Sequence, residues 1–245
     1  MNRWLLFLLL LLAGTLDGQG QTLPPSRQAE ADTARLGEVV RLGRHVQLTA
    51  LPALAYPRHL RFFTAGSVLD CWQDQQGRYQ GQFVQWVREV TPDKEAATQR
   101  EFILTQSLTM PTVQALFAGL DSCQLLRVPD ESAIRGWNRN ILDGVAYTLE
   151  YRGEQTHQVA NYSNPTSQGP LPEAQPVLRF LKQLDRLGQL RQVFGRAIPY
   201  QCWTNGSGTV VCRVVSYAQQ AAYKRDRQRY RRQQAKHSPV KPTLP

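Results

Sequence analysis

The chain has 245 residues, of which 42% are hydrophobic, and this length suits one domain with extensions. That apolar content is enough to bury a sizeable core, so the sequence excludes a disulfide-rich miniprotein. The formal net charge is +10, but residues 224–245 hold eight Lys or Arg and one Asp, so most of the excess lies in the C-terminal tail.

The first residues have the order of a secretory signal peptide. One Arg in residues 1–3 precedes an unbroken apolar run over residues 4–12, and small and polar residues follow as far as Gly20. The run is shorter than the roughly 20 apolar residues that a transmembrane helix needs. We therefore expect residues 1–20 to be a signal peptide and residues 21–32 to be a leader into the domain, which is exported to the periplasm or the extracellular space.

Turn residues divide residues 33–216 into strand and helix signals, and we expect these residues to form a single domain. Runs of apolar and β-branched residues predict strands, which are, in chain order, 45–51, 61–75, 79–90, 101–109, 144–152, 155–162 and two arms of a hairpin over 198–215. The clearest is 144–152, because Val145, Tyr147, Leu149 and Tyr151 alternate strictly with more polar residues.

Apolar residues at three- and four-residue spacing predict two amphipathic helices, and residues 33–42 favour a further short one. The first amphipathic helix follows Thr109, which is a suitable N-cap. Its apolar face consists of Val113, Leu116, Phe117 and Leu120. The second begins near Glu173. Its apolar stripe consists of Val177, Phe180, Leu181, Leu184, Leu187 and Leu190.

These elements predict an α+β fold, with a mainly antiparallel sheet and the two amphipathic helices packed on one of its faces. Residues 217–236 are rich in Ala, Gln and Arg and have high helix propensity, but they lack a wide apolar stripe. We therefore expect residues 217–245 to be a basic, helical or disordered C-terminal tail that contributes little to stability.

Four cysteines, Cys71, Cys123, Cys202 and Cys212, allow three disulfide connectivities. The Gly-rich turn sequence at 205–208 places Cys202 opposite Cys212, where a cross-strand bridge is feasible. The expected disulfides are therefore Cys202–Cys212 and, as the remainder, Cys71–Cys123. Four buried free thiols are the alternative, and they would suit a cytosolic protein better.

Sequence motifs of catalysis and metal binding are missing: there is no H-E-x-x-H, C-x-x-C, G-x-S-x-G or acidic calcium loop. No two histidines have ligand spacing, so we expect no metal and no cofactor. Two alternatives stay open. One is a thiol–imidazole pair of Cys71 or Cys123 with His157, and the other is a carboxylate pair of Asp143 and Glu150.

A polar segment with one aromatic residue is the first candidate binding surface. It consists of Trp137, Asn138, Arg139 and Asn140, and such a mixture of groups is typical of carbohydrate and peptide sites. The alternative, which we favour, is a loop whose Trp packs onto the neighbouring hairpin, because Trp is usually buried.

The tail is a second candidate, for binding a polyanion. Its cations are Lys224, Arg225, Arg227, Arg229, Arg231 and Arg232, with Tyr223 and Tyr230 among them. Each cation near an anionic membrane contributes about 1 kcal/mol, so an anionic membrane surface is a candidate partner. The competing interpretation, a solvated tail that only aids solubility, is the commoner case. Export argues against nucleic acid as a physiological target.

One stretch of the chain combines a capped helix, a strand with the pattern D-G-x-x-Y-x-L-E at 143–150, a strand ending in Y-S-N-P at 162–165, and an amphipathic helix. In this order of elements, residues 109–187 resemble small exported bacterial proteins of unknown function. That family has no assigned activity, so the resemblance implies an α+β fold but no role for any residue.

From these observations we expect an exported protein that binds an unknown protein or envelope partner and is not an enzyme. The alternative is a small extracytoplasmic hydrolase with an unmarked active site. Convergent polar side chains in a deep pocket would favour the hydrolase, whereas a shallow surface would favour binding.

The signal-peptide pattern predicts the mature N-terminus. After expression in an exporting bacterial host, N-terminal sequencing of the secreted protein should begin within a few residues of Gln21, because the small residues before it form the cleavage site. Recovery of the intact chain with Met1 in the cytosol would contradict this expectation.

Overall fold

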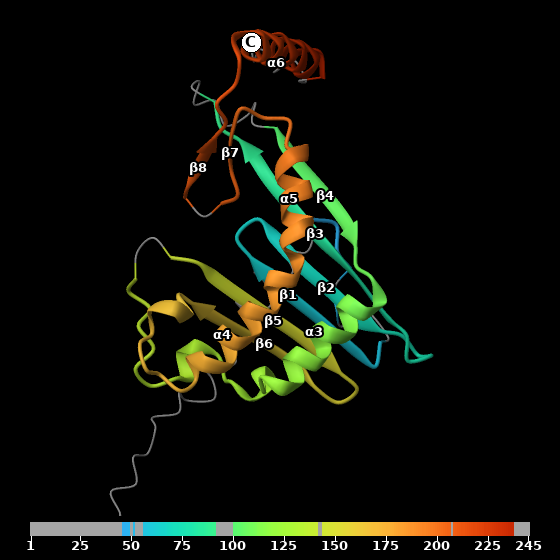
Figure 1. Cartoon of the computed structure of the whole chain (residues 1–245), viewed down its shortest axis with the longest axis vertical. Coiled ribbons are helices and arrows are strands. Elements are labelled where there is room, and N and C mark those ends of the chain that lie inside the picture. Colours follow the sequence, from blue (N-terminus) through green and yellow to red (C-terminus); the bar gives the residue numbers. More distant parts are fainter. Residues whose placement is uncertain are drawn as a thin grey trace, which may run out of the picture.

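The computed structural model describes residues 46–49, 51, 56–91, 100–141, 144–206 and 208–237. Within these residues the chain forms the predicted α+β fold, an antiparallel sheet of eight strands with helices on one face (Figure 1). The predictions for the signal peptide, the leader and the helix over 33–42 lie outside the described residues, as does Asp143.

The sheet contains eight strands among the described residues. They are β1 (Arg58–Thr64), β2 (Ser67–Gln73), β3 (Tyr79–Glu89), β4 (Glu101–Ser107), β5 (Ala146–Gly153), β6 (His157–Ser163), β7 (Cys202–Thr204) and β8 (Val210–Cys212). Their order across the sheet is β6-β5-β1-β2-β3-β7-β8. Strand β4 pairs with the edge of β3 that faces away from β2 and β7.

The single strand predicted over 61–75 is wrong, because the chain turns within it. A turn at Ala65-Gly66 separates β1 from β2, and Gly66 has φ +71°, which favours glycine. A Cβ atom at Gly66 would also lie only 2.5 Å from the Cβ atom of Asn205. Apolar residues flank this turn on both sides, so the sequence run continues through it.

The helices on the sheet match the predicted amphipathic segments. Helix α3 (Met110–Ser122) begins after Thr109, whose side chain accepts a hydrogen bond from the backbone N–H of Thr112 at 3.4 Å. The second segment divides into α4 (Ala174–Gln183), a short 3₁₀ turn and α5 (Gly188–Ala197). Helices α3 and α4 cover β1, β2 and β5, and α5 lies farther along, beside β3 and β4 (Figure 1).

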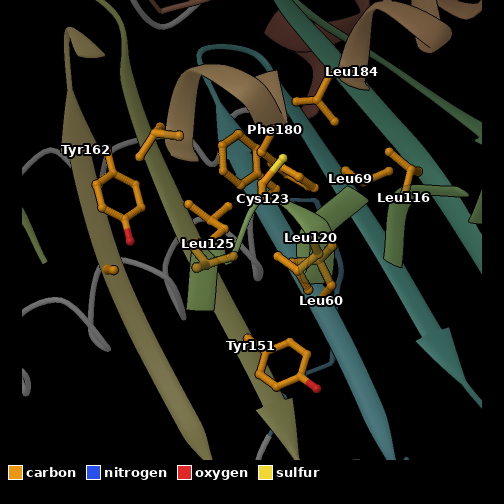
Figure 2. Close-up of a cluster of buried hydrophobic side chains, with 14 of the residues drawn as sticks. Leu60, Leu69, Leu116, Leu120, Cys123, Leu125, Tyr151, Tyr162, Phe180 and Leu184 are labelled. Carbon is orange, nitrogen blue, oxygen red and sulfur yellow. The ribbon is translucent and has the colours of Figure 1, made fainter. Parts of the chain in front are cut away.

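The main core lies between the sheet and helices α3 and α4 (Figure 2). Phe180 of α4 is fully buried and meets the ring of Phe62 from β1 at 5.2 Å between centroids. Val177, Leu184 and Leu187 of the predicted stripe are also buried. Leu181 and Leu190 are only partly buried against this core, so the stripe is narrower than the sequence predicts.

The structure confirms one disulfide and corrects the other. Cys202 and Cys212 face each other across β7 and β8 and are joined, with 4.1 Å between their Cα atoms. Cys71 and Cys123 are instead free, buried thiols. Cys71 lies beside Val113, in the first turn of α3, where Sγ and Cγ2 are both close to Gly81. Since an α-helix rises about 1.5 Å per residue, Cys123 lies roughly 15 Å farther along α3.

The other face of the sheet has no α-helix among the described residues. Its apolar part is a smaller cluster in which Val46 and Leu48, from the segment before β1, pack on Phe63, Val68 and Trp86. The rest of this face holds the charged cluster described below, with the rings of Tyr56 and Trp72 beside His59.

The burial of Phe180 predicts a large loss of stability on truncation. Phe180→Ala should lower the free energy of unfolding by about 3–5 kcal/mol, because it removes a whole ring from a closed core. Arg179→Ala, at the exposed neighbouring position, should change it by less than about 0.5 kcal/mol. Reversible urea melts of both variants check this, and equal melts would mean that α4 packs by another face.

Candidate functional site

The segment 137–140, a candidate binding surface in the sequence, does not expose its aromatic ring. The Trp137 ring is buried beside Tyr162, and its Nε1–H donates to the carbonyl of Ser163 at 3.0 Å. Asn138, Arg139 and Asn140 are exposed. The indole therefore fixes the loop to β6, as the favoured alternative describes, and only polar side chains remain at the surface.

A buried cluster of charged side chains occupies the helix-free face of the sheet. Asp70 of β2 lies at its centre. Asp70 accepts hydrogen bonds from His59 Nε2 at 2.6 Å, from Arg61 Nε at 2.8 Å and from Gln82 Nε2 at 3.0 Å. The Arg61 guanidinium also lies 3.9 Å from Glu150 Oε2. These side chains come from four strands, β1, β2, β3 and β5, and His59, Arg61, Asp70 and Glu150 are buried.

The electrostatics of this cluster favour a fixed ion pair. Burial opposes ionisation of Asp70, but the hydrogen bond from His59 and the charge of Arg61 outweigh it and hold the pKa of Asp70 below its ordinary value. His59 Nδ1 and Glu150 Oε2 are buried without a hydrogen-bond partner. None of the residues in this cluster lines the cleft described below.

The open thiol–imidazole alternative is wrong. Cys71 faces the helices and lies in the core beneath α3. His157 lies on the other face of the sheet, with Nε2 3.3 Å from Glu150 Oε1. Cys123 is in the helix-side core as well. Burial also raises the pKa of the Cys71 thiol well above its ordinary value, which disfavours the reactive thiolate.

A cleft of about 860 Å³ opens on the helix side of the sheet. Its walls are α4, α5 and the β7–β8 hairpin, and its floor is the turn between β1 and β2 with the end of β3. The charged side chains that line it are Lys182, Asp185 and Arg191, all of them exposed. Its described lining contains no histidine or cysteine, and Asp185 is the one carboxylate in that lining.

Helix α6 (Tyr217–His237) forms within the predicted basic tail, and its side chains contact the sheet. Glu89, at the end of β3, is fully buried, and its carboxylate accepts hydrogen bonds from Arg100 Nε at 2.8 Å and from the Tyr223 hydroxyl. Arg227 of α6 is buried and lies 3.7 Å from Glu89 Oε1. Arg100 NH1 also donates to Asp226 Oδ2 at 2.6 Å.

Opposite charges hold this attachment together. Burial alone would raise the pKa of Glu89, but the hydrogen bonds from Arg100 and Tyr223 outweigh it and leave that pKa below its ordinary value. Burial and the hydrogen bond to Glu89 raise the pKa of Tyr223 to about 12. The Arg100 guanidinium also lies over the rings of Tyr200 and Tyr230, 5.3 Å from each centroid. The sequence gives no local sign of these contacts.

The cations predicted to bind a polyanion therefore separate into two groups. Arg227 is turned inward and Arg231 is partly buried, whereas Lys224, Arg225, Arg229 and Arg232 are exposed. Arg225, Arg229, Arg232 and the exposed Lys236 follow one another at spacings of four, three and four residues, so they share one face of α6. We call these four residues the basic stripe. It extends over about 16 Å.

Comparison with protein-family models finds no match, and neither does comparison with curated proteins. Among the described residues, no group of three His, Cys, Asp or Glu side chains is arranged to hold a metal ion. In the same part of the chain, no helix is both long enough and apolar enough to cross a membrane. The site has to be judged from its own geometry.

The Glu89 contacts predict how α6 is held. Glu89→Gln should speed hydrogen exchange in α6 at neutral pH by at least about fivefold, because hydrogen bonds to a charged group contribute about 1–3 kcal/mol. The pKa of Glu89 is lower in the folded protein than in the unfolded chain, where it is about 4.3. The stabilisation by Glu89 is therefore fully present above about pH 4.3 and is lost as the pH falls through the pKa of Glu89 in the folded protein.

Exchange measured by mass spectrometry on α6 peptides checks this prediction. Glu154→Gln, at the exposed β5–β6 turn, makes the same charge change and should leave exchange in α6 unchanged. Unaltered α6 exchange in Glu89→Gln would show that other contacts hold the helix.

Proposed function

We propose that the protein is an exported, non-enzymatic binding protein that attaches to an anionic membrane surface through helix α6. The observation that carries the proposal is the basic stripe, which lies on a helix whose other face is fixed to the sheet by Tyr223, Asp226 and Arg227. Exposed cations on a held helix are presented together, and each one contributes about 1 kcal/mol near an anionic leaflet.

Two exposed hydrophobic side chains at the start of α6 favour a membrane over a soluble polyanion. Val214 is fully exposed and Tyr217, the first residue of α6, is almost fully exposed. Valine gains nothing from contact with a hydrated polyanion, whereas tyrosine is suited to the boundary between headgroups and acyl chains.

Export is supported by the signal-peptide pattern and by the disulfide between Cys202 and Cys212. Both cysteines lie on a hairpin that is at least partly exposed, and such a disulfide persists in an oxidising compartment. A binding role without catalysis is supported by the two candidate sites, since the buried charge cluster is closed and the described lining of the open cleft has no histidine, no cysteine and no pair of carboxylates.

Vesicle binding by the mature protein tests the proposal. We expect binding to vesicles in which about a third of the lipid is anionic, and release as salt rises towards 1 M, where charges are screened within about 3 Å. The variant with Arg225→Gln, Arg229→Gln and Arg232→Gln should bind at least about 100-fold more weakly, because three contributions of about 1 kcal/mol are lost.

A matched control separates the basic stripe from net charge. Arg179→Gln, Arg186→Gln and Arg196→Gln remove the same charge from exposed positions on α4, α5 and the turn between them. This control should bind almost as the wild type does. An equal loss in both variants would mean that total charge, and not α6, attracts the protein to the membrane.

A further inference from the structure

The cleft beside α4 and α5 has the size and lining of a small-molecule site. Its volume of about 860 Å³ lies within the range of roughly 300–1,000 Å³ that such sites have. Leu178 and Leu181 of α4, Phe194 of α5, and Trp203 and Val211 of the hairpin line it. Three separate elements thus direct apolar side chains into one space.

Several polar groups in the floor of the cleft are already paired. The backbone N–H of Trp86 donates to the carbonyl of Gly66 at 2.9 Å, and Asn205 Nδ2 donates to the carbonyl of Ala65 at 3.2 Å. Gln85 Oε1 accepts from the Gln106 side chain at 3.2 Å. These groups are not free to pair with a peptide backbone, which binds an extended site through main-chain hydrogen bonds. The occupant is therefore held mainly by apolar contact.

The charged groups around the cleft define the other end of its ligand. Lys182, Asp185 and Arg191 are exposed and make no ion pair with any other described residue, which leaves one net positive charge. Tyr147 lines the same cleft. Burial raises the pKa of Tyr147, although the positive charge of Arg191 opposes that rise. The phenol is therefore protonated at neutral pH and can donate a hydrogen bond to an anion.

We propose that this cleft binds a single-chain anionic amphiphile, with its acyl chain against Leu181, Phe194 and Trp203 and its carboxylate or phosphate group at Lys182, Arg191 and the Tyr147 hydroxyl. Hydrophobic burial supplies most of the affinity, since the gain grows with every methylene removed from water. The cations and the phenol select an anionic head group. The site shares no residue with the basic stripe.

Calorimetric titration of the mature protein, below the micelle concentration, tests this site with four probes: dodecanoate, dodecyl phosphate, dodecanol and inorganic phosphate. Both anionic amphiphiles should bind, dodecanol should bind at least about tenfold more weakly, and inorganic phosphate should not bind. A preference for dodecanoate or for dodecyl phosphate identifies the head group. Equal binding of dodecanol, or no binding of either anion, overturns the proposal.

Two pairs of variants locate the binding. A Cβ atom at Gly195, which lines the cleft on α5, meets nothing within 4 Å, so Gly195→Trp can place an indole at the cleft. It should weaken dodecanoate at least about tenfold, whereas Gly188→Trp, also in open space but outside the cleft, should not. Arg191→Gln should weaken both anions about fivefold and leave dodecanol unchanged, and Arg196→Gln should have no effect. Full dodecanoate binding by Gly195→Trp would falsify the assignment to this cleft.

Discussion

The register of the sheet depends on Arg61, whose guanidinium lies between two carboxylates on neighbouring strands. Arg61 of β1 is directly opposite Asp70 of β2 and Glu150 of β5. Shifting β1 by one residue would turn this charge into the apolar core under α3 and α4 and would move Leu60 and Phe62 to the other face. Separating a buried charge from its partners costs about 3–5 kcal/mol. The native alternation is therefore strongly favoured.

Once that register is set, the two faces of the sheet acquire different properties. The helix side receives Leu60, Phe62 and Leu69 and is closed by α3 and α4. At the far end, β2 gives way to β7 along the same edge of β3. The turn at Ala65-Gly66 meets Asn205 at this point. The cleft lies at the junction of β2 and β7 along β3, and α4 and α5 form its opposite wall.

The parts of this fold that the sequence predicts are those with local causes. The hairpin over 198–215 has its Gly-rich turn, α3 has Thr109 as its cap, and α4 has an apolar stripe, so all three were predictable. The turn at Ala65-Gly66 was not, because the apolar run continues on both sides of it. The Cys71–Cys123 pairing was predicted only because these two cysteines remained after Cys202 was paired with Cys212. Such a choice takes no account of distance, and Cys71 and Cys123 lie at opposite ends of α3.

The candidate sites were harder to predict, because their contacts join distant parts of the chain. The pairing of Arg61 with Asp70 and Glu150 requires the register of three strands, which a single sequence does not contain. Asp226 lies 126 residues from Arg100, and Tyr223 lies 134 residues from Glu89. Composition identified the basic tail correctly, but it could not distinguish the inward Arg227 from its outward neighbours.

The division of the α6 cations into inward and outward groups changes the free energy of binding to an anionic surface. A flexible tail must lose backbone and side-chain freedom when its cations gather on a surface, and this ordering opposes binding. Helix α6 has already lost most of its backbone freedom, because Glu89 and Arg100 hold its inner face. The carboxylates of Glu89 and Asp226 also neutralise part of the positive charge around that face. The positive charge that stays uncompensated is that of the basic stripe, which lies on the outward face of α6.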